Sequence, residues 1–170
     1  MLLGDVEAKA VGNALKELGP WHVSYAANIT SAGAAEAAMR AAVLRFGGID
    51  ILISNAGSAT GGAMLEISDD AFRKAFELNF FAHKNFATEA ARLMKTQGRG
   101  GQILFNISKQ AINPGKNMGA YGTPKAATLF LMRQLTLELA GSGIRVNGMN
   151  ADRIRSGLLT DDFIKERAAA

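Results

Sequence analysis

The feature that most constrains the fold is a regular alternation of short apolar runs with longer amphipathic stretches. One run, 49–54 (IDILIS), is almost continuously apolar, which is typical of a parallel strand that is covered on both faces. Two further strands are expected, a buried one over 102–108 (QILFNIS) and another over 144–150 (IRVNGMN). The stretches between them are long enough for the crossover helices that parallel strands require. The pattern therefore predicts an α/β protein with a doubly wound, Rossmann-like parallel sheet.

The same alternation predicts the remaining elements. Helices are expected over 5–18, 30–46, 68–96 and 121–140, a fourth strand over 21–29, and the stub of a strand over 2–5. Thr30 and Ser68 are the expected N-caps because each hydroxyl can accept a hydrogen bond from a free N–H of the first turn. Glycines stand where all four of these helices should end.

Composition limits the class of protein. The chain has 170 residues, no cysteine, 48% hydrophobic and 20% charged residues and a net charge of +4. This balance is typical of a soluble globular domain. The absence of cysteine excludes disulfides and thiolate chemistry. We expect one cytoplasmic domain over 1–170, with no signal peptide, no membrane span and, because its basic residues are scattered, no nucleic-acid partner.

Tyr121 and Lys125 stand four residues apart in AYGTPKAA, at the start of a predicted helix. That spacing places two side chains on one helix face. An ammonium close to a phenol favours its ionised form, and such a tyrosine can exchange a proton with an alcohol or a carbonyl. An accidental pair on one helix face is the alternative interpretation.

Other polar residues follow the predicted strands. Ser108 ends QILFNIS, and Asn55-Ala56-Gly57 comes directly after IDILIS. Ligands bind at the carboxyl ends of strands in open α/β sheets, although a serine there can also simply cap the strand. Asn79 interrupts an apolar helix, where a buried amide needs partners. Its role can be structural or functional.

Five motifs in this order resemble the classical short-chain dehydrogenases/reductases, and the resemblance runs from Leu2 to about Leu159. They are SNAG (54–57), ELN (77–79), NIS (106–108), YGTPK (121–125) and GIRVN (143–147). The resemblance implies that Tyr121 is the catalytic acid/base and that Lys125 assists it and holds the nicotinamide ribose. It implies that Ser108 polarises the substrate carbonyl and that Asn79 supports a water linked to Lys125.

The resemblance also implies a nicotinamide cofactor and the residues that hold it. Asn55, Ala56 and Gly57 would line the adenosine side of the cleft. Asp5 would accept hydrogen bonds from the ribose diol, which favours NAD over NADP. Asn28 stands where the family usually has an aspartate that contacts adenine, and the backbone amide of Ile154 would reach the nicotinamide carboxamide. The substrate would be a small alcohol or carbonyl compound, and no metal ligand set is visible.

The sequence departs from the family pattern at two places near these residues. Ala151-Asp152 replaces the usual proline-glycine after the GIRVN strand. Pro124 directly precedes Lys125, and proline is tolerated only in the first turn of a helix. We therefore predict that this helix begins close to Tyr121. The histidines, His22 and His83, are isolated and are interpreted as structural or surface residues.

The family's first strand, glycine-rich loop and first helix have no counterpart here, and no G-x-G-x-x-G occurs. The absent strand would be central in the sheet, so the strands at 21–29 and 49–54 lack a shared neighbour. The last segment of the family fold is also cut short. We therefore expect a fragment of the fold that is unstable and has little turnover on its own.

A narrower resemblance concerns the stretches NISKQAINPGKNMGAYGTPKAAT and NADRIRSGLLTDD. They are similar to the dehydrogenase half of bifunctional aldolase/short-chain dehydrogenases, which implies a small hydroxyaldehyde or a sugar-derived alcohol as substrate.

Two other functions remain open. The apolar helix 126–139 could belong to a catalytically silent interaction domain, although relatives use it in a homo-oligomer interface. A sugar-nucleotide epimerase or dehydratase of the extended relatives would share Tyr121 and Lys125.

Overall fold

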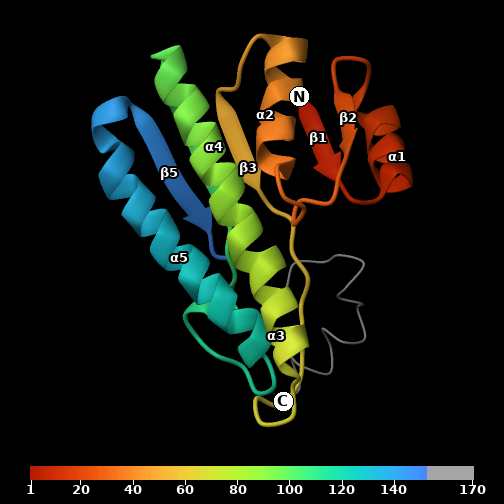
Figure 1. The fold of residues 1–170 in the computed structure, drawn as a ribbon, viewed down its shortest axis with the longest axis vertical. Helices are drawn as coiled ribbons and strands as arrows, with labels where there is room; N and C mark the ends of the chain where they lie inside the picture. The colour runs from red at the N-terminus through yellow and green to blue at the C-terminus, as the bar shows by residue number, and fades with distance from the viewer. Residues whose placement is uncertain (153–170) are drawn as a thin grey trace.

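The structure is a computed structural model of the chain, and it describes residues 1–152 (Figure 1). Strands and helices alternate as the apolar pattern predicts. In chain order the elements are β1 (Leu2–Asp5), α1 (Ala8–Leu18), β2 (Val23–Ala26), α2 (Ala34–Phe46), β3 (Ile51–Ser54), α3 (Asp69–Phe76), the π-helical turn η1 (Glu77–Phe81), α4 (Ala82–Gln97), β4 (Gly101–Asn106), the 3₁₀ turn η2 (Lys109–Ala111), α5 (Gly119–Leu139), the 3₁₀ turn η3 (Ala140–Ser142) and β5 (Ile144–Met149).

All strand pairs are parallel, which confirms the predicted sheet type. β1 pairs with β2, and β4 lies between β3 and β5, so the described strands form two separate sheets. Within residues 1–152 no strand joins the β1–β2 pair to β3, which agrees with the expectation that the strands at 21–29 and 49–54 lack a shared neighbour. Figure 1 shows both sheets with their strands running in the same general direction.

The main core lies between the three-stranded sheet and helices α4 and α5. Ile103 and Phe105 of β4 and Val146 of β5 alternate with more exposed residues and pack against this helical layer. The alternation means that one face of this sheet is covered. In β3 the side chains of Ile51 and Ile53 are 57% and 58% exposed. The prediction that its apolar run is covered on both faces is therefore wrong for this strand.

The long helix predicted over 68–96 is interrupted. Ser68 caps α3 as predicted, because its Oγ accepts a hydrogen bond from Ala71 N at 3.2 Å. The π turn η1 then separates α3 from α4. Such a turn inserts an extra residue into a helix and is frequent at functional sites. Asn79 lies within it.

Several predicted boundaries were wrong for local reasons. α2 begins at Ala34 after a left-handed Gly33, because Thr30 bonds through its N and Oγ1 to Asn28 Oδ1 instead of capping the helix. α1 begins at Ala8, because Asp5 ends β1 and its Oδ1 accepts a hydrogen bond from Glu7 N.

Helix α5 begins at Gly119, two residues before Tyr121, which confirms that it begins close to this tyrosine. Pro124 therefore lies in the second turn and not in the first. Within the described part of the chain, every helix is too short or too polar to cross a membrane.

Candidate active site

The candidate site lies where β3 and β4 end and α5 begins. The strand arrows in Figure 1 point toward the half of the molecule in which α5 starts. This end of a parallel sheet is where α/β proteins bind ligands, because the loops that follow the strands can separate there. Tyr121 and Lys125 are contributed by the first two turns of α5.

Lys125 is a buried cation at the centre of the site. Its side chain is 2% exposed, and its Nζ donates a hydrogen bond to the carbonyl oxygen of Asn106 at 2.9 Å. The Nζ also lies 5.8 Å from the centroid of the Tyr121 ring, within the range of a cation–π interaction. Burial lowers the pKa of Lys125 to about 8. The lysine is therefore still mostly charged at neutral pH.

Gly57 brings the end of β3 into close contact with these groups. A Cβ atom at Gly57 would lie 2.8 Å from Asn79 Oδ1 and 3.5 Å from Lys125 Nζ. Only glycine lets the backbone approach so closely. Gly57, Asn79 and Lys125, which the sequence assigned to one site, therefore lie together.

Asn79 is fully buried in the π turn, and its amide is satisfied by protein groups. Its Oδ1 accepts a hydrogen bond from Ser58 N at 3.3 Å, and its Nδ2 donates to Ser58 O at 3.0 Å and to Ala75 O at 3.1 Å. The amide therefore fixes the loop after β3, which is a structural role, while its role in the reaction stays a prediction.

Ser108 lies two residues beyond the end of β4, because the strand ends earlier than predicted. Its Oγ accepts a hydrogen bond from Gln110 N at 3.2 Å and caps the turn η2. That turn packs tightly on α5, since a Cβ atom at Gly122 would lie 3.0 Å from Gln110 O. Ser108 and Tyr121 therefore belong to neighbouring segments.

Asp5 and Asn28 belong to the other sheet. Both side chains are exposed, and a hydrogen bond of 3.0 Å from Ala27 N to Asp5 O links the ends of β1 and β2 beside them. The Asn28 side chain already bonds to Thr30, so its Oδ1 is engaged. Ile154 lies outside the described residues.

The ledge formed by Asn55, Ala56 and Gly57 is exposed at the end of β3. Asn55 Oδ1 accepts a hydrogen bond of 2.7 Å from Asn106 Nδ2, which connects the ends of β3 and β4. Asn106 thus bonds to both Asn55 and Lys125, a role that sequence analysis missed. Its place in the NIS motif was the available signal.

His83 is a structural residue, one of the two interpretations that the sequence left open. It is neither isolated nor at the surface, because it is 1% exposed and its Nδ1 lies 2.6 Å from Ser54 Oγ. Its spacing of four residues from Asn79, which places both on one helix face, was a signal for the structural role.

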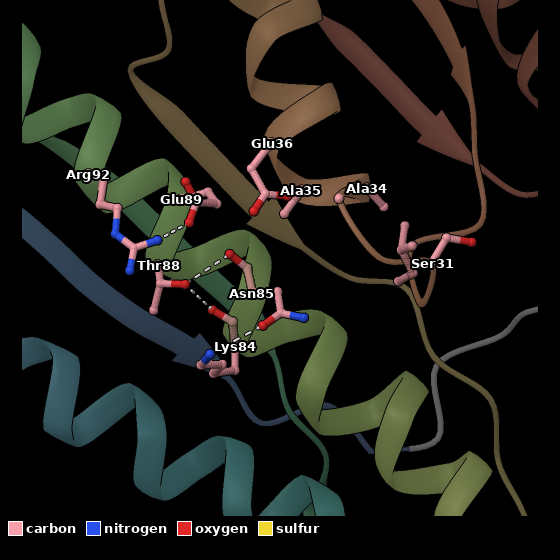
Figure 2. Close-up of a pocket in the computed structure, with 11 residues that line it drawn as sticks. Ser31, Ala34, Ala35, Glu36, Lys84, Asn85, Thr88, Glu89 and Arg92 are labelled. Carbon is pink, nitrogen blue, oxygen red and sulfur yellow. Dashed lines mark hydrogen bonds and ion pairs between the residues drawn. The ribbon is translucent and has the colours of Figure 1, made fainter.

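A separate hollow lies between the start of α2 and the middle of α4 (Figure 2). Ser31, Glu36, Lys84, Thr88 and Arg92 are among the residues that line it. None of the residues that the sequence predicted for the site lines this hollow. In residues 1–152 no group of three potential ligands could hold a metal ion.

Comparison with known proteins decides the family. The family model described as short chain dehydrogenase matches residues 2–166, nearly the whole chain. The chain belongs to the short-chain dehydrogenase family. This is a family of enzymes, and the site described above carries the motifs by which the sequence resembled it.

Curated relatives of this short-chain dehydrogenase include a hydroxysteroid dehydrogenase and an uncharacterized oxidoreductase. It is 32% identical over 168 residues to the 7alpha-hydroxysteroid dehydrogenase of Escherichia coli (strain K12), covering 97% of this chain and 63% of that protein. It is 34% identical over 145 residues to the uncharacterized oxidoreductase YuxG of Bacillus subtilis (strain 168), covering 84% of this chain and 21% of that protein. The chain spans less than two thirds of the length of these relatives.

Solved structures confirm the Rossmann-like fold. The structure of 7 alpha-hydroxysteroid dehydrogenase in complex with NADH and 7-oxo glycochenodeoxycholic acid matches with a TM-score of 0.81 at 32% identity, covering 88% of this chain and 59% of that one. The 3-ketoacyl-(acyl-carrier-protein) reductase from Brucella melitensis, complexed with NADH, matches with a TM-score of 0.84 at 25% identity, covering 88% and 63%.

Proposed function

We propose that this protein is an oxidoreductase that interconverts an alcohol and a carbonyl compound with a nicotinamide cofactor. The observation that carries the proposal is the buried Lys125 ammonium, which lies beside the Tyr121 ring and 3.5 Å from where a Cβ atom at Gly57 would lie, just after the end of β3. A buried cation next to a phenol is the arrangement that proton exchange with an alcohol requires.

Tyr121, in this proposal, removes the proton from the substrate hydroxyl or returns it to the carbonyl oxygen. Lys125 assists this proton transfer through its charge, and Ser108 donates a hydrogen bond to the substrate oxygen. Asn79 acts as a support for the solvent link to Lys125. When bound, the cofactor accepts or supplies the hydride.

The exposed end of β3 fits a cofactor that lies against backbone. Asn55, Ala56 and Gly57 leave a ledge without large side chains, and Gly57 has no room for a Cβ. We assign the adenosine side of the cofactor to this ledge, to Asp5 and to Asn28, and the nicotinamide side to Tyr121, Lys125 and the amide of Ile154. The NADH complexes of two relatives support a nicotinamide cofactor for this chain.

NAD rather than NADP is the proposed cofactor. Support comes from Asp5, whose exposed carboxylate stands at the end of β1. A carboxylate accepts hydrogen bonds from a ribose diol and repels a 2′-phosphate.

The proposed substrate is a small hydroxyaldehyde or a sugar-derived alcohol. The narrower resemblance to bifunctional aldolase/short-chain dehydrogenases supports it, and so does 29% identity over 148 residues to the sorbitol dehydrogenase of Cereibacter sphaeroides. The match to only 21% of YuxG is consistent with a dehydrogenase region inside a longer protein. Hydroxysteroids are the competing substrate class, because the chain is also similar to the 7alpha-hydroxysteroid dehydrogenase of Escherichia coli.

We further propose that residues 1–170 are one partial domain of a cytoplasmic homo-oligomer. Phe130 and Leu137 on α5 are 67% and 77% exposed, which supports a contact between copies along this helix.

The test uses the protein expressed from its complete gene, with NAD and a panel of short hydroxyaldehydes, polyols and hydroxysteroids. We expect NADH to form with the hydroxyaldehydes or polyols, and Lys125→Met to abolish that activity. Lys116→Met is the matched control, because Lys116 is exposed. A wild-type protein that binds no nicotinamide cofactor would instead indicate a silent interaction domain.

A further inference from the structure

The buried pair of Ser54 and His83 has no role in the reaction proposed above. Ser54 is the last residue of β3, and its Oγ lies 2.6 Å from His83 Nδ1. The two side chains are only 9% and 1% exposed. The other ring nitrogen of His83, Nε2, is buried and has no hydrogen-bond partner among the described residues.

His83 and Asn79 hold the two ends of one short loop. Asn79 bonds twice to the backbone of Ser58, and His83 bonds to the side chain of Ser54. Between these two attachment points lie only residues 55–57, the exposed ledge of the candidate site. The helical segment formed by η1 and α4 is therefore hydrogen-bonded to the residues at both ends of this ledge.

The segment formed by η1 and α4 is in turn hydrogen-bonded to α5. Thr128 Oγ1 donates a hydrogen bond of 2.8 Å to Asn79 O and another of 3.0 Å to Pro124 O. Thr128 is fully buried, one turn after Lys125 on α5. The ledge, the π turn and the helix that bears Tyr121 are thus joined in one hydrogen-bonded unit.

The geometry points to His83 as a positioning residue: together with Asn79 it holds residues 55–57 in the conformation that receives the cofactor. This inference rests on the proposed function, since it assigns the ledge to cofactor binding. His83 itself touches no reacting atom. Asn79 and His83 are four residues apart on the helical segment, and their partners Ser58 and Ser54 are four residues apart on the loop. Because the two spacings match, one helical segment can hold both ends of the loop.

The neutral imidazole suits this task. Burial, and then the charge of Lys125, lower the pKa of His83 to about 4. A neutral ring can share a hydrogen with Ser54 Oγ and adds no second positive charge beside Lys125. The simpler reading is that His83 only fills space next to Phe105, whose ring centroid lies 6.2 Å away.

Three variants separate the two readings. His83→Phe keeps an aromatic ring but removes the bond to Ser54. His83→Asn can place a polar atom where Nδ1 lies, and so should rescue the bond. Ser54→Ala removes the partner with a smaller change, and it carries the test if His83→Phe does not fold.

Amide hydrogen exchange and NADH affinity are measured on the protein from its complete gene. For His83→Phe and Ser54→Ala we expect faster exchange at residues 55–58 and a Kd for NADH raised about tenfold, since one buried hydrogen bond is lost. We expect kcat at saturating cofactor to stay near the wild-type value, and His83→Asn to restore both readouts.

Unchanged exchange at residues 55–58, with only global stability lowered, would overturn the inference in favour of a space-filling role. Faster exchange with an unaltered Kd for NADH would overturn the link to the cofactor. If the wild-type protein bound no NADH, the proposed function would fail, and with it that link, while the exchange data would still show whether His83 holds the loop.

Discussion

Lys125 is the residue on which the site depends most, because it lies close to the ends of β3 and β4 as well as to Tyr121 on its own helix. Its Nζ donates to the end of β4 at Asn106 O, lies over the Tyr121 ring of its own helix, and would contact a Cβ atom at Gly57. A cation with 2% exposure needs such partners, since burial of an unpaired charge is strongly unfavourable. This explains why three motifs distant in sequence depend on one another.

Gly57→Ala tests the close contact at the residue scale. The added Cβ would lie 2.8 Å from Asn79 Oδ1, so the ledge or the π turn has to shift. We expect loss of cofactor binding by at least about tenfold, together with a fall in unfolding free energy of ~1–3 kcal/mol. Gly12→Ala, on α1 with open space around it, is the control and should leave binding unchanged.

Asp5→Asn tests the cofactor preference. Asparagine keeps an acceptor for Glu7 N but loses the charge that repels a 2′-phosphate. We expect the ratio of NAD to NADP affinity to fall by about tenfold, measured by titration of both cofactors. A wild-type preference for NADP, or a ratio that the substitution leaves unaltered, would refute this role of Asp5.

His83 gives a signature in the pH dependence of stability. Its pKa in the folded state, about 4, lies below the ordinary value of 6.5, so the unfolded chain binds more protons between these two values. Folding stability therefore rises with pH across that window, by up to ~1.4 kcal/mol per pH unit. Denaturant titrations at pH 4.5–7 should show a shallower rise for His83→Phe than for wild type; parallel curves would contradict the assignment.

The sequence predicted that Gly57, Asn79 and Lys125 lie together, since their motifs follow the ends of parallel strands or face them, and the structure brings these three residues together. It could not predict the hydrogen-bond partners of the Asn79 amide, because the Ser58 backbone reaches this amide only through the path of the loop after β3. It left open whether His83 is structural or at the surface, because the sequence alone does not show the buried Ser54, 29 residues away, to which His83 bonds.

At the scale of elements, the π turn is the main departure from what the sequence predicted. The amphipathic pattern indicated one continuous helix from Ser68, and the structure divides it at Glu77–Phe81. Nothing in the pattern indicated the extra residue, because its stabilisation comes from tertiary bonds such as Thr128 Oγ1 to Asn79 O. Element types were confirmed, whereas the ends shifted where a local side chain competed, as Asn28 does with Thr30.

The two N-caps predicted from the sequence, Ser68 and Thr30, offer a test at this scale. Ser68→Ala should lower the unfolding free energy by ~1 kcal/mol, because it removes the bond to Ala71 N. Thr30→Ala should change it by less than ~0.5 kcal/mol, since Thr30 is exposed and caps no helix. Thermal or denaturant unfolding of both variants gives the comparison, and equal losses would contradict the observed helix starts.

At the scale of the whole molecule, the two separate sheets are the most consequential feature. β1 and β3 each have an edge that pairs with no strand of the described chain, and Ile51 and Ile53 add exposed apolar surface to β3. Unpaired edges with apolar side chains promote association.

The 170-residue chain should therefore self-associate at micromolar concentration. Ile53→Lys should reduce this association in sedimentation experiments, because a charge on an edge strand blocks pairing. Leu44→Lys serves as control, since Leu44 is 82% exposed and lies on helix α2, so it belongs to neither edge strand. A similar reduction by both substitutions would indicate a general effect of charge instead.

The central claim is that the Tyr121 hydroxyl carries the proton beside the buried Lys125, and kcat of Tyr121→Phe tests it most directly. The measurement uses the protein from its complete gene at saturating cofactor and substrate, with Tyr25→Phe, the chain's other tyrosine, as control. We expect Tyr121→Phe to lower kcat by at least about 100-fold while the Kd for the cofactor stays within about twofold. Turnover close to that of Tyr25→Phe would contradict the claim.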